Sequence, residues 1–176
     1  MKKFLPTSTS LSINKTYKNS AGFTLIELLV ALTIVAILAV SVYVALNPAQ
    51  RLKDSKDARR STDVDSILTA VHQYIVDNKG SAPSNMPSGT NEQQIGTGDA
   101  TACPASVGKC TSLTAGCVNL GATGQLNKYL ASIPVDPDTT LGTAASTGYS
   151  VKTDVNGIVT VTACHTDGAT AISVSR

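Results

Sequence analysis

Gly22-Phe23-Thr24-Leu25-Ile26-Glu27 opens the apolar run around which the rest of this chain is organised. The run extends over 24 residues from Phe23 to Leu46, and Glu27 is its one ionisable side chain apart from the weakly acidic phenol of Tyr43. A helix of about 20 apolar residues can cross the hydrocarbon core of a bilayer. A carboxylate in such a helix costs at least ~2.5 kcal/mol on insertion scales, so Glu27 indicates a function and a charged partner.

Residues 1–22 have the composition of a leader that stays in the cytoplasm. They are polar, have no apolar segment of their own, and contain no acid and four lysines, namely Lys2, Lys3, Lys15 and Lys18. A secretory signal peptide carries its apolar segment before the cleavage point, whereas here the apolar run follows Gly22. Lysines on this side favour a cytoplasmic N-terminus. A cut after Gly22 would give Phe23 a free amine, the obvious partner for Glu27, and an uncleaved signal anchor is the alternative.

The segment AGFTLIELLVALTIVAILAV, residues 21–40, resembles the N-terminus of bacterial type IV pilins and of the pseudopilins of type II secretion systems. The resemblance is strong over about residues 20–45 and looser as far as Asp77. It implies cleavage after Gly22, N-methylation of Phe23, and a requirement for Glu27 in filament assembly. It also implies the type IV pilin fold, an α+β fold in which a long N-terminal helix packs on a small antiparallel sheet.

A helical pattern continues beyond the apolar run. Val64 begins a stripe of apolar residues at offsets of 3, 4, 7, 10 and 11, which is the period of one helix face. The opposite face carries Lys53, Lys56, Asp57, Arg60, Asp63 and Asp65, of which Lys53 and Asp57 can form an i,i+4 pair.

Proline and glycine residues indicate where this helix is interrupted and where it ends. Pro48 predicts a kink or local melting, with a full stop of the helix as the alternative, and Asn78-Lys79-Gly80 predicts its C-terminus. We therefore predict one helix over about residues 23–77, kinked near Pro48. Residues 23–46 form its membrane-spanning or filament-core half, and residues 47–79 contain its amphipathic half.

Residues 80–176 are expected to form a globular head domain. Gly80–Asp99 is rich in proline and glycine and predicts an irregular surface segment. Asn156-Gly157 predicts a type I′ turn between two strands. The expected elements are a short helical turn within Gly124–Leu130, strands at Tyr149–Val155 and Ile158–Cys164, and an edge strand at Ala171–Val174. This antiparallel sheet should cover the apolar stripe, and both hairpin faces are apolar enough to do so.

The head domain contains Cys103, Cys110, Cys117 and Cys164. An even number of cysteines outside the cytoplasm predicts two disulfides, for which three connectivities exist. The intervals of 7, 7 and 47 residues do not fit a zinc site, and His165 next to Cys164 has no paired ligand. All three connectivities stay open, and Cys103–Cys110 with Cys117–Cys164 is the pairing that we expect.

We expect no catalytic residues, no metal site and no cofactor. Asp136, Asp138 and Asp154 could ligate calcium, which related pseudopilins carry near such loops, but their spacing is not that of an EF-hand. His72 is expected to be a structural or solvated histidine. No Ser/His/Asp signature or phosphate loop is present.

The net charge of the mature chain bears on one class of partner. Four of the 14 basic residues lie in the leader, which leaves ten against 12 acidic residues in the mature chain, so overall charge gives nucleic-acid binding no support.

The resemblance implies a structural subunit of a type IV pilus or pilus-like filament, not an enzyme. Its implied partners are other copies of the chain through the N-terminal helices, a prepilin peptidase/methyltransferase, the inner-membrane assembly platform of a pilus or secretion system, and the membrane before assembly. The precursor would cross the inner membrane once, with the head domain outside the cytoplasm. The assembled subunit would then lie in an extracellular pilus or a periplasm-spanning filament.

Three alternatives remain open. Pro-Val-Asp-Pro at residues 134–137 resembles a segment of major pseudopilins and favours a type II secretion filament, whereas two cysteine pairs favour a pilin. A minor or DNA-uptake pilin belongs to the same class. A membrane-anchored extracellular binding module is the alternative from a different class.

Overall fold

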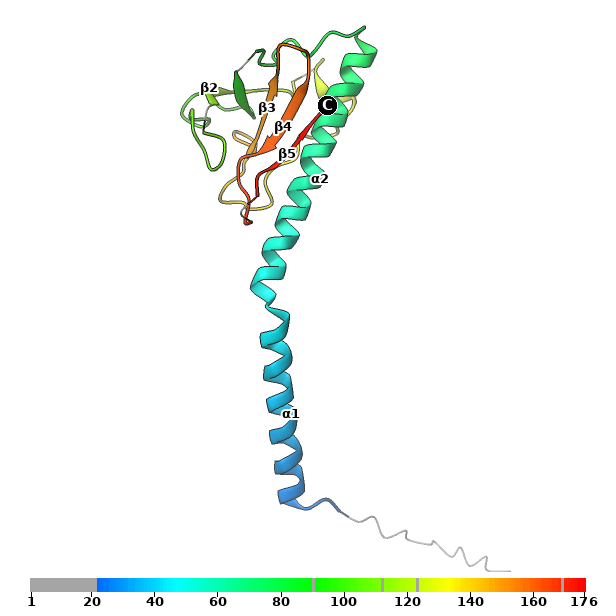
Figure 1. Ribbon diagram of the computed structural model, residues 1–176, viewed down its shortest axis with the longest axis vertical. Coiled ribbons are helices and arrows are strands. Elements are labelled where there is room, and N and C mark those ends of the chain that lie inside the picture. The colour runs from blue at the N-terminus through cyan, green and yellow to red at the C-terminus, as the bar shows by residue number, and fades with distance from the viewer. Residues whose placement is uncertain (1–21, 90, 112, 123, 169) are drawn as a thin grey trace, which may run out of the picture. The chain divides into compact units, whose positions relative to one another are not determined.

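The computed structural model describes residues 22–89, 91–111, 113–122, 124–168 and 170–176, so the leader expected at residues 1–22 lies outside it except for Gly22. The chain forms two compact units that meet between Ala45 and Leu46. The first contains nearly all of helix α1 (Leu25–Leu46). The second contains helix α2 (Pro48–Asp77) and a five-stranded sheet (Figure 1).

The expected interruption near Pro48 is confirmed, and it takes the form of a new helix start. Asn47 separates α1 from α2 in a left-handed conformation with φ 40° and ψ 69°. Its carbonyl oxygen accepts hydrogen bonds from the N–H groups of Gln50 (3.0 Å) and Arg51 (3.2 Å), so it begins the hydrogen bonding of α2. Pro48 occupies the first turn of α2, where its missing N–H would have had no helical partner.

The amphipathic pattern of α2 builds the core of the head unit. The stripe residues Val64, Ile67, Leu68 and Val71 are almost fully buried, and α2 packs against strands β4 and β5. The hairpin face that meets them is the one that bears Tyr149, Val151, Val159, Val161 and Ala163, all of which are inaccessible to solvent. Ile158 is 44% exposed, so it lies outside this face. The structure thus settles which hairpin face packs on the helix.

The sheet has the order β2-β1-β3-β4-β5. Its strands are β1 (Glu92–Ile95), β2 (Leu113–Val118), β3 (Tyr149–Thr153), β4 (Val159–Ala163) and β5 (Ile172–Ser175). β5 confirms the expected edge strand, and the short 3₁₀ helix η1 (Leu126–Lys128) confirms the expected helical turn. Strands β1 and β2 pair in parallel, and the remaining neighbouring strands pair antiparallel, so the sheet is mostly antiparallel.

Two local predictions were wrong. Residues 80–99 are not entirely irregular, because β1 lies inside them and buries Gln94 and Ile95 between its neighbours. The β3–β4 turn is not type I′, because that turn needs positive φ at both central residues and only Gly157 has it. The Asp154 carboxylate accepts hydrogen bonds from the N–H groups of Asn156 and Ile158, both at 2.8 Å. These bonds favour a three-residue loop that ends in a left-handed glycine.

The two disulfides join Cys103 to Cys117 and Cys110 to Cys164, so the expected pairing was wrong. Backbone hydrogen bonds explain the observed pairing. The N–H of Gly116 donates to the carbonyl of Cys103 at 2.8 Å, which brings the start of the loop to β2. The N–H of Lys109 donates to the carbonyl of Cys164 at 2.6 Å, which holds the far end of the loop against the end of β4.

Removing the second disulfide should destabilise the chain more than removing the first. The bridges close loops with separations of 14 and 54 residues, and the chain-entropy model assigns them about 3 and about 4 kcal/mol. We expect the Cys110→Ala/Cys164→Ala variant to unfold at lower urea concentration than the Cys103→Ala/Cys117→Ala variant. Equal midpoints, or the reverse order, would contradict the loop-length argument.

The prediction that Arg60 lies on the polar, solvent-facing side of the helix is wrong. Arg60 is the largest fully buried side chain of the described residues. It lies one helical turn before Val64, at the start of the buried stripe. Its guanidinium donates two hydrogen bonds of 2.9 Å to Asp136, one of 2.8 Å to Asp57 and one of 2.7 Å to Asp167. The hydrogen bonds that Arg60 donates to these carboxylates, those to Asp136 above all, raise the pKa of Arg60 above its ordinary value.

This Arg60 cluster (Arg60, Asp57, Asp136 and Asp167) ties α2 to two distant loops. Asp136 belongs to the Pro-Val-Asp-Pro segment, and its side chain is fully buried. Asp167 belongs to the β4–β5 connection, whose N–H groups at Asp167 and Gly168 also donate to Asp57, at 3.0 and 2.8 Å. Beside the cluster, a hydrogen bond from Lys56 lowers the pKa of Asp138 below its usual range.

Candidate processing and assembly site

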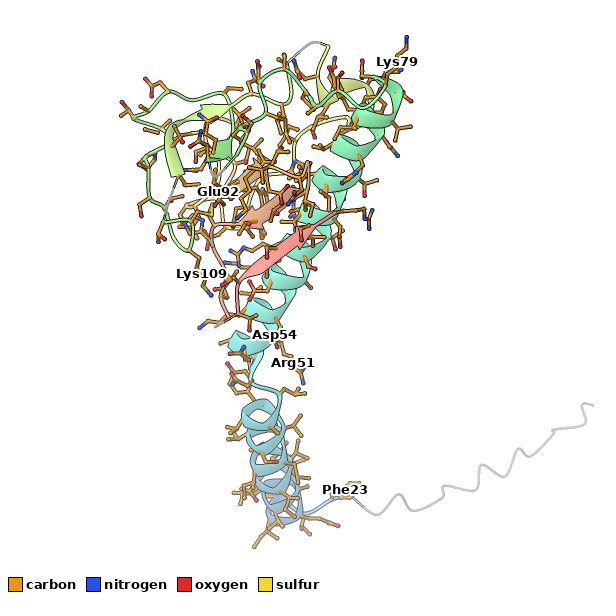
Figure 2. All side chains as sticks on the ribbon, turned by 45° about the horizontal axis from the view of Figure 1, so that its top comes forward. Phe23, Arg51, Asp54, Lys79, Glu92 and Lys109 are labelled. Carbon is orange, nitrogen blue, oxygen red and sulfur yellow. A yellow bond between two sulfur atoms is a disulfide. The ribbon has the colours of Figure 1, made fainter. Side chains whose placement is uncertain are left out.

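The bond between Gly22 and Phe23 lies before the first helical residue, Leu25. Phe23 is 84% exposed, and a Cβ atom placed on Gly22 would meet nothing within 4 Å. Figure 2 shows Phe23 on the segment that leads into α1. A protease needs an accessible, non-helical stretch of backbone, and this bond provides one.

Thr24 fixes the start of α1. Its hydroxyl oxygen accepts a hydrogen bond from the N–H of Glu27 at 3.2 Å, and its carbonyl accepts one from the N–H of Leu28 at 3.2 Å. Thr24-Leu25-Ile26-Glu27 has the spacing of a capping box, in which Ser or Thr at the N-cap binds the N–H of the third helical residue. The cap therefore places the Glu27 carboxylate in the first turn, where the helix dipole favours negative charge.

The surface of α1 is apolar on all sides. None of its residues is buried, and its large apolar side chains range from 48% exposed at Val30 to 82% at Leu25. The hydroxyls of Thr33 and Ser41 donate to carbonyls within the helix, at 2.7 and 2.8 Å, so they need no outside partner. In the part of the chain that the structure describes, the helical stretch from Leu25 is long and apolar enough to cross a membrane by length and composition.

Comparison with known families matches this end of the chain. The family described as "Prokaryotic N-terminal methylation motif" matches residues 17–43. The chain carries a prokaryotic N-terminal methylation motif. This motif is the hallmark of type IV pilins and pseudopilins, which are structural proteins. No curated protein and no solved structure matches the chain.

The methylation motif agrees with the geometry of the site. It implies processing by a prepilin peptidase and assembly into pilus-like filaments, and together with α1 it fits a membrane-anchored precursor. Gly22, Phe23 and Glu27 all lie within the matched residues, on the exposed segment and the first helical turn. Their individual roles stay predictions.

The aspartates considered for calcium have other partners. Asp136 binds Arg60, Asp138 binds Lys56, and Asp154 accepts hydrogen bonds from the N–H groups of its own turn. Within residues 22–176, leaving aside the four undescribed positions, no group of three His, Cys, Asp or Glu side chains could hold a metal ion. These three carboxylates therefore do not form one site, while the absence of a cofactor stays a prediction.

Sequence reasoning missed two features, and each had a signal. The Thr24 cap could have been found from the Thr-x-x-Glu spacing immediately before an apolar run. The burial of Arg60 could have been suspected because it continues the stripe of Val64, Ile67 and Leu68 by one turn.

His72 was considered as a possible catalytic residue. It lies on α2, its Nε2 atom is buried without a hydrogen-bond partner, and no nucleophile is paired with it in the described residues.

Proposed function

We propose that this chain is a structural subunit of a type IV pilus or pilus-like filament, assembled from the inner membrane through α1. One observation carries the proposal. An exposed Gly22–Phe23 bond directly precedes a helix that is apolar on every side and has a single carboxylate in its first turn. An ordinary membrane anchor has no use for that carboxylate, whereas a helix that moves from lipid into a filament core does.

The proposed mechanism follows from the two environments of α1. Before assembly, lipid covers its exposed apolar surface. After extraction, α1 helices pack side by side in the filament core, and Glu27 neutralises the methylated amine of Phe23 of its own or a neighbouring subunit. A buried charge is costly without a partner, so this pair would also set the register between subunits.

Changing Gly22 to Ala tests the processing step. A Cβ at this position meets nothing within 4 Å, so the substitution leaves the fold intact and changes only what the peptidase recognises. We expect the variant to accumulate as the full-length precursor, still membrane-bound. Intact-mass spectrometry of the parent chain should find a mature form that starts at N-methylated Phe23. A cleaved product from Gly22→Ala would contradict the assigned cleavage site.

A major pseudopilin of a type II secretion system is the second candidate. The Pro-Val-Asp-Pro segment favours it, and the two disulfides favour the pilus. Electron microscopy of filaments sheared from the cell surface, combined with an assay of secreted enzymes in a deletion strain, separates the two. Surface filaments with normal secretion support a pilus, including a DNA-uptake pilus. Lost secretion without surface filaments supports the pseudopilin.

A further inference from the structure

The first two turns of α2 are exposed and carry two cations, Arg51 and Lys53. Every residue from Leu46 to Ser55 is exposed, and Figure 1 shows the start of α2 extending beyond the sheet. Among the described residues, neither the guanidinium of Arg51 nor the ammonium of Lys53 has a hydrogen bond or an ion pair. The expected Lys53–Asp57 pair is not formed, because Asp57 is held in the Arg60 cluster.

These turns have an apolar face with a cation on each flank. Successive helical residues are rotated by about 100°, so Arg51 and Lys53 lie on either side of Leu52, which is 62% exposed. Pro48 lies one turn before Leu52 on the same face. Asp54 lies roughly opposite, where the side-chain amide of Gln50 donates to its carboxylate at 2.8 Å (Figure 2 labels Arg51 and Asp54). The one acid of this segment therefore lies on the face opposite Leu52.

The sequence brings this face close to the bilayer surface. α1 has 22 residues, which makes it about 33 Å long, close to the ~30 Å thickness of the hydrocarbon core. A helix that spans the core thus ends near its edge. The break at Asn47 agrees with this depth, because backbone groups freed from helical hydrogen bonds are tolerated in water or headgroups and not in hydrocarbon. Leu52 follows Leu46 by only six residues, so the length of chain between them keeps Leu52 near this edge.

We propose that residues Pro48–Asp54, which we name the headgroup segment, bind anionic phospholipid headgroups of the leaflet on the side of the head domain. Leu52 would meet the upper acyl chains, while Arg51 and Lys53 extend along the surface to lipid phosphates. The proposal rests on the proposed function in one respect, the crossing of the membrane by α1. The new element is the class of lipid that the subunit binds before assembly, namely anionic phospholipid.

A single-tryptophan variant tests this proposal on the full chain. The chain contains no tryptophan, so Leu52→Trp introduces one fluorophore at an exposed position. The variant is reconstituted in phosphatidylcholine vesicles that contain phosphatidylglycerol, and either lipid is brominated in its acyl chains. The ratio of quenching gives the relative association of the two lipids. Near an anionic surface each cation is worth about 1 kcal/mol, so we expect about fivefold or greater preference for phosphatidylglycerol, which high salt should reduce.

Charge variants locate the preference. Adding Arg51→Gln and Lys53→Gln should bring the association of the two lipids close to equal. Adding Arg59→Gln and Lys79→Gln, which removes one exposed cation from α2 and one just after its end, should leave the preference intact. Equal association in the Leu52→Trp parent, an unchanged preference after Arg51→Gln/Lys53→Gln, or no quenching because another copy covers the segment would each overturn the proposal.

A second probe separates this proposal from the proposed function. Val35, 61% exposed in the middle of α1, is changed to Trp in a separate variant. Strong quenching at this position by both lipids, with no preference at position 52, would reject the headgroup segment and leave the membrane anchor standing. No quenching at position 35 would reject the anchor, and both proposals with it.

Discussion

Replacing Glu27 with Ala is expected to abolish filament assembly while leaving cleavage and membrane insertion intact. The substitution removes the one carboxylate from α1, so each subunit that enters the filament core brings a Phe23 amine without a counter-charge. Breaking a buried ion pair by removal of one partner costs about 3–5 kcal/mol, which weakens the addition of every subunit by at least about a hundredfold. Electron microscopy of sheared filaments, together with membrane fractionation, measures both outcomes.

Two control variants make the Glu27 result specific. Glu27→Gln keeps the size of the side chain and removes its charge, so it should fail to assemble as Glu27→Ala does. Thr33→Ala removes a polar group from α1 whose hydrogen bond lies within the helix, so it should assemble normally. Filaments of ordinary length from Glu27→Ala would show that the amine finds another partner, and the proposed mechanism would then be wrong.

Replacing Arg60 with Met should give the largest loss of stability in the head unit. Asp136 would then be a fully buried carboxylate without a cation, and Asp57 and Asp167 would lose the same partner. A broken buried pair costs about 3–5 kcal/mol, a large part of the 5–15 kcal/mol that typically stabilises a domain. Urea unfolding of the detergent-solubilised chain, followed by near-UV circular dichroism, measures the loss.

A double variant tests whether the unpaired charge causes that loss. Asp136→Asn keeps an oxygen for the N–H of Asp138, which now donates to the carboxylate at 2.8 Å, and it removes the charge. We expect Arg60→Met/Asp136→Asn to lose less stability than the sum of the two single variants. The matched control is Lys56→Met, which removes a part-exposed pair with Asp138 and should cost a small fraction of the Arg60 loss. Additive costs would mean that Arg60 acts through packing alone.

The helices were predictable because their signals are local. The methylation motif, the apolar run and the period of the stripe from Val64 to Ile75 can all be read along the chain without knowledge of distant contacts. Arg60 shares that period and was still misplaced, because a charged residue at the end of a stripe normally faces water. Its burial depends on Asp136 and Asp167, which are 76 and 107 residues away.

The head domain was less predictable because its pairings are not local. The disulfides follow from which backbone segments meet at β2 and at the end of β4, and cysteine spacing does not contain that information. β1 is four residues long and is surrounded by turn residues, so its pattern is too short to stand out. The β3–β4 turn depends on the Asp154 side chain, which competes with the conformation that Asn-Gly adopts by itself.

The position of the Arg60 cluster has a mechanical consequence for a subunit that is pulled. Force applied through α1 enters the head unit at the beginning of α2, and Arg60 is the first residue along α2 that is fully buried. Along α2, its hydrogen bonds to Asp136 and Asp167 come before the apolar contacts made by Val64 and the residues that follow. The pulling force would therefore act first on these charge-assisted hydrogen bonds, and it would reach the sheet and its two disulfides only after they break.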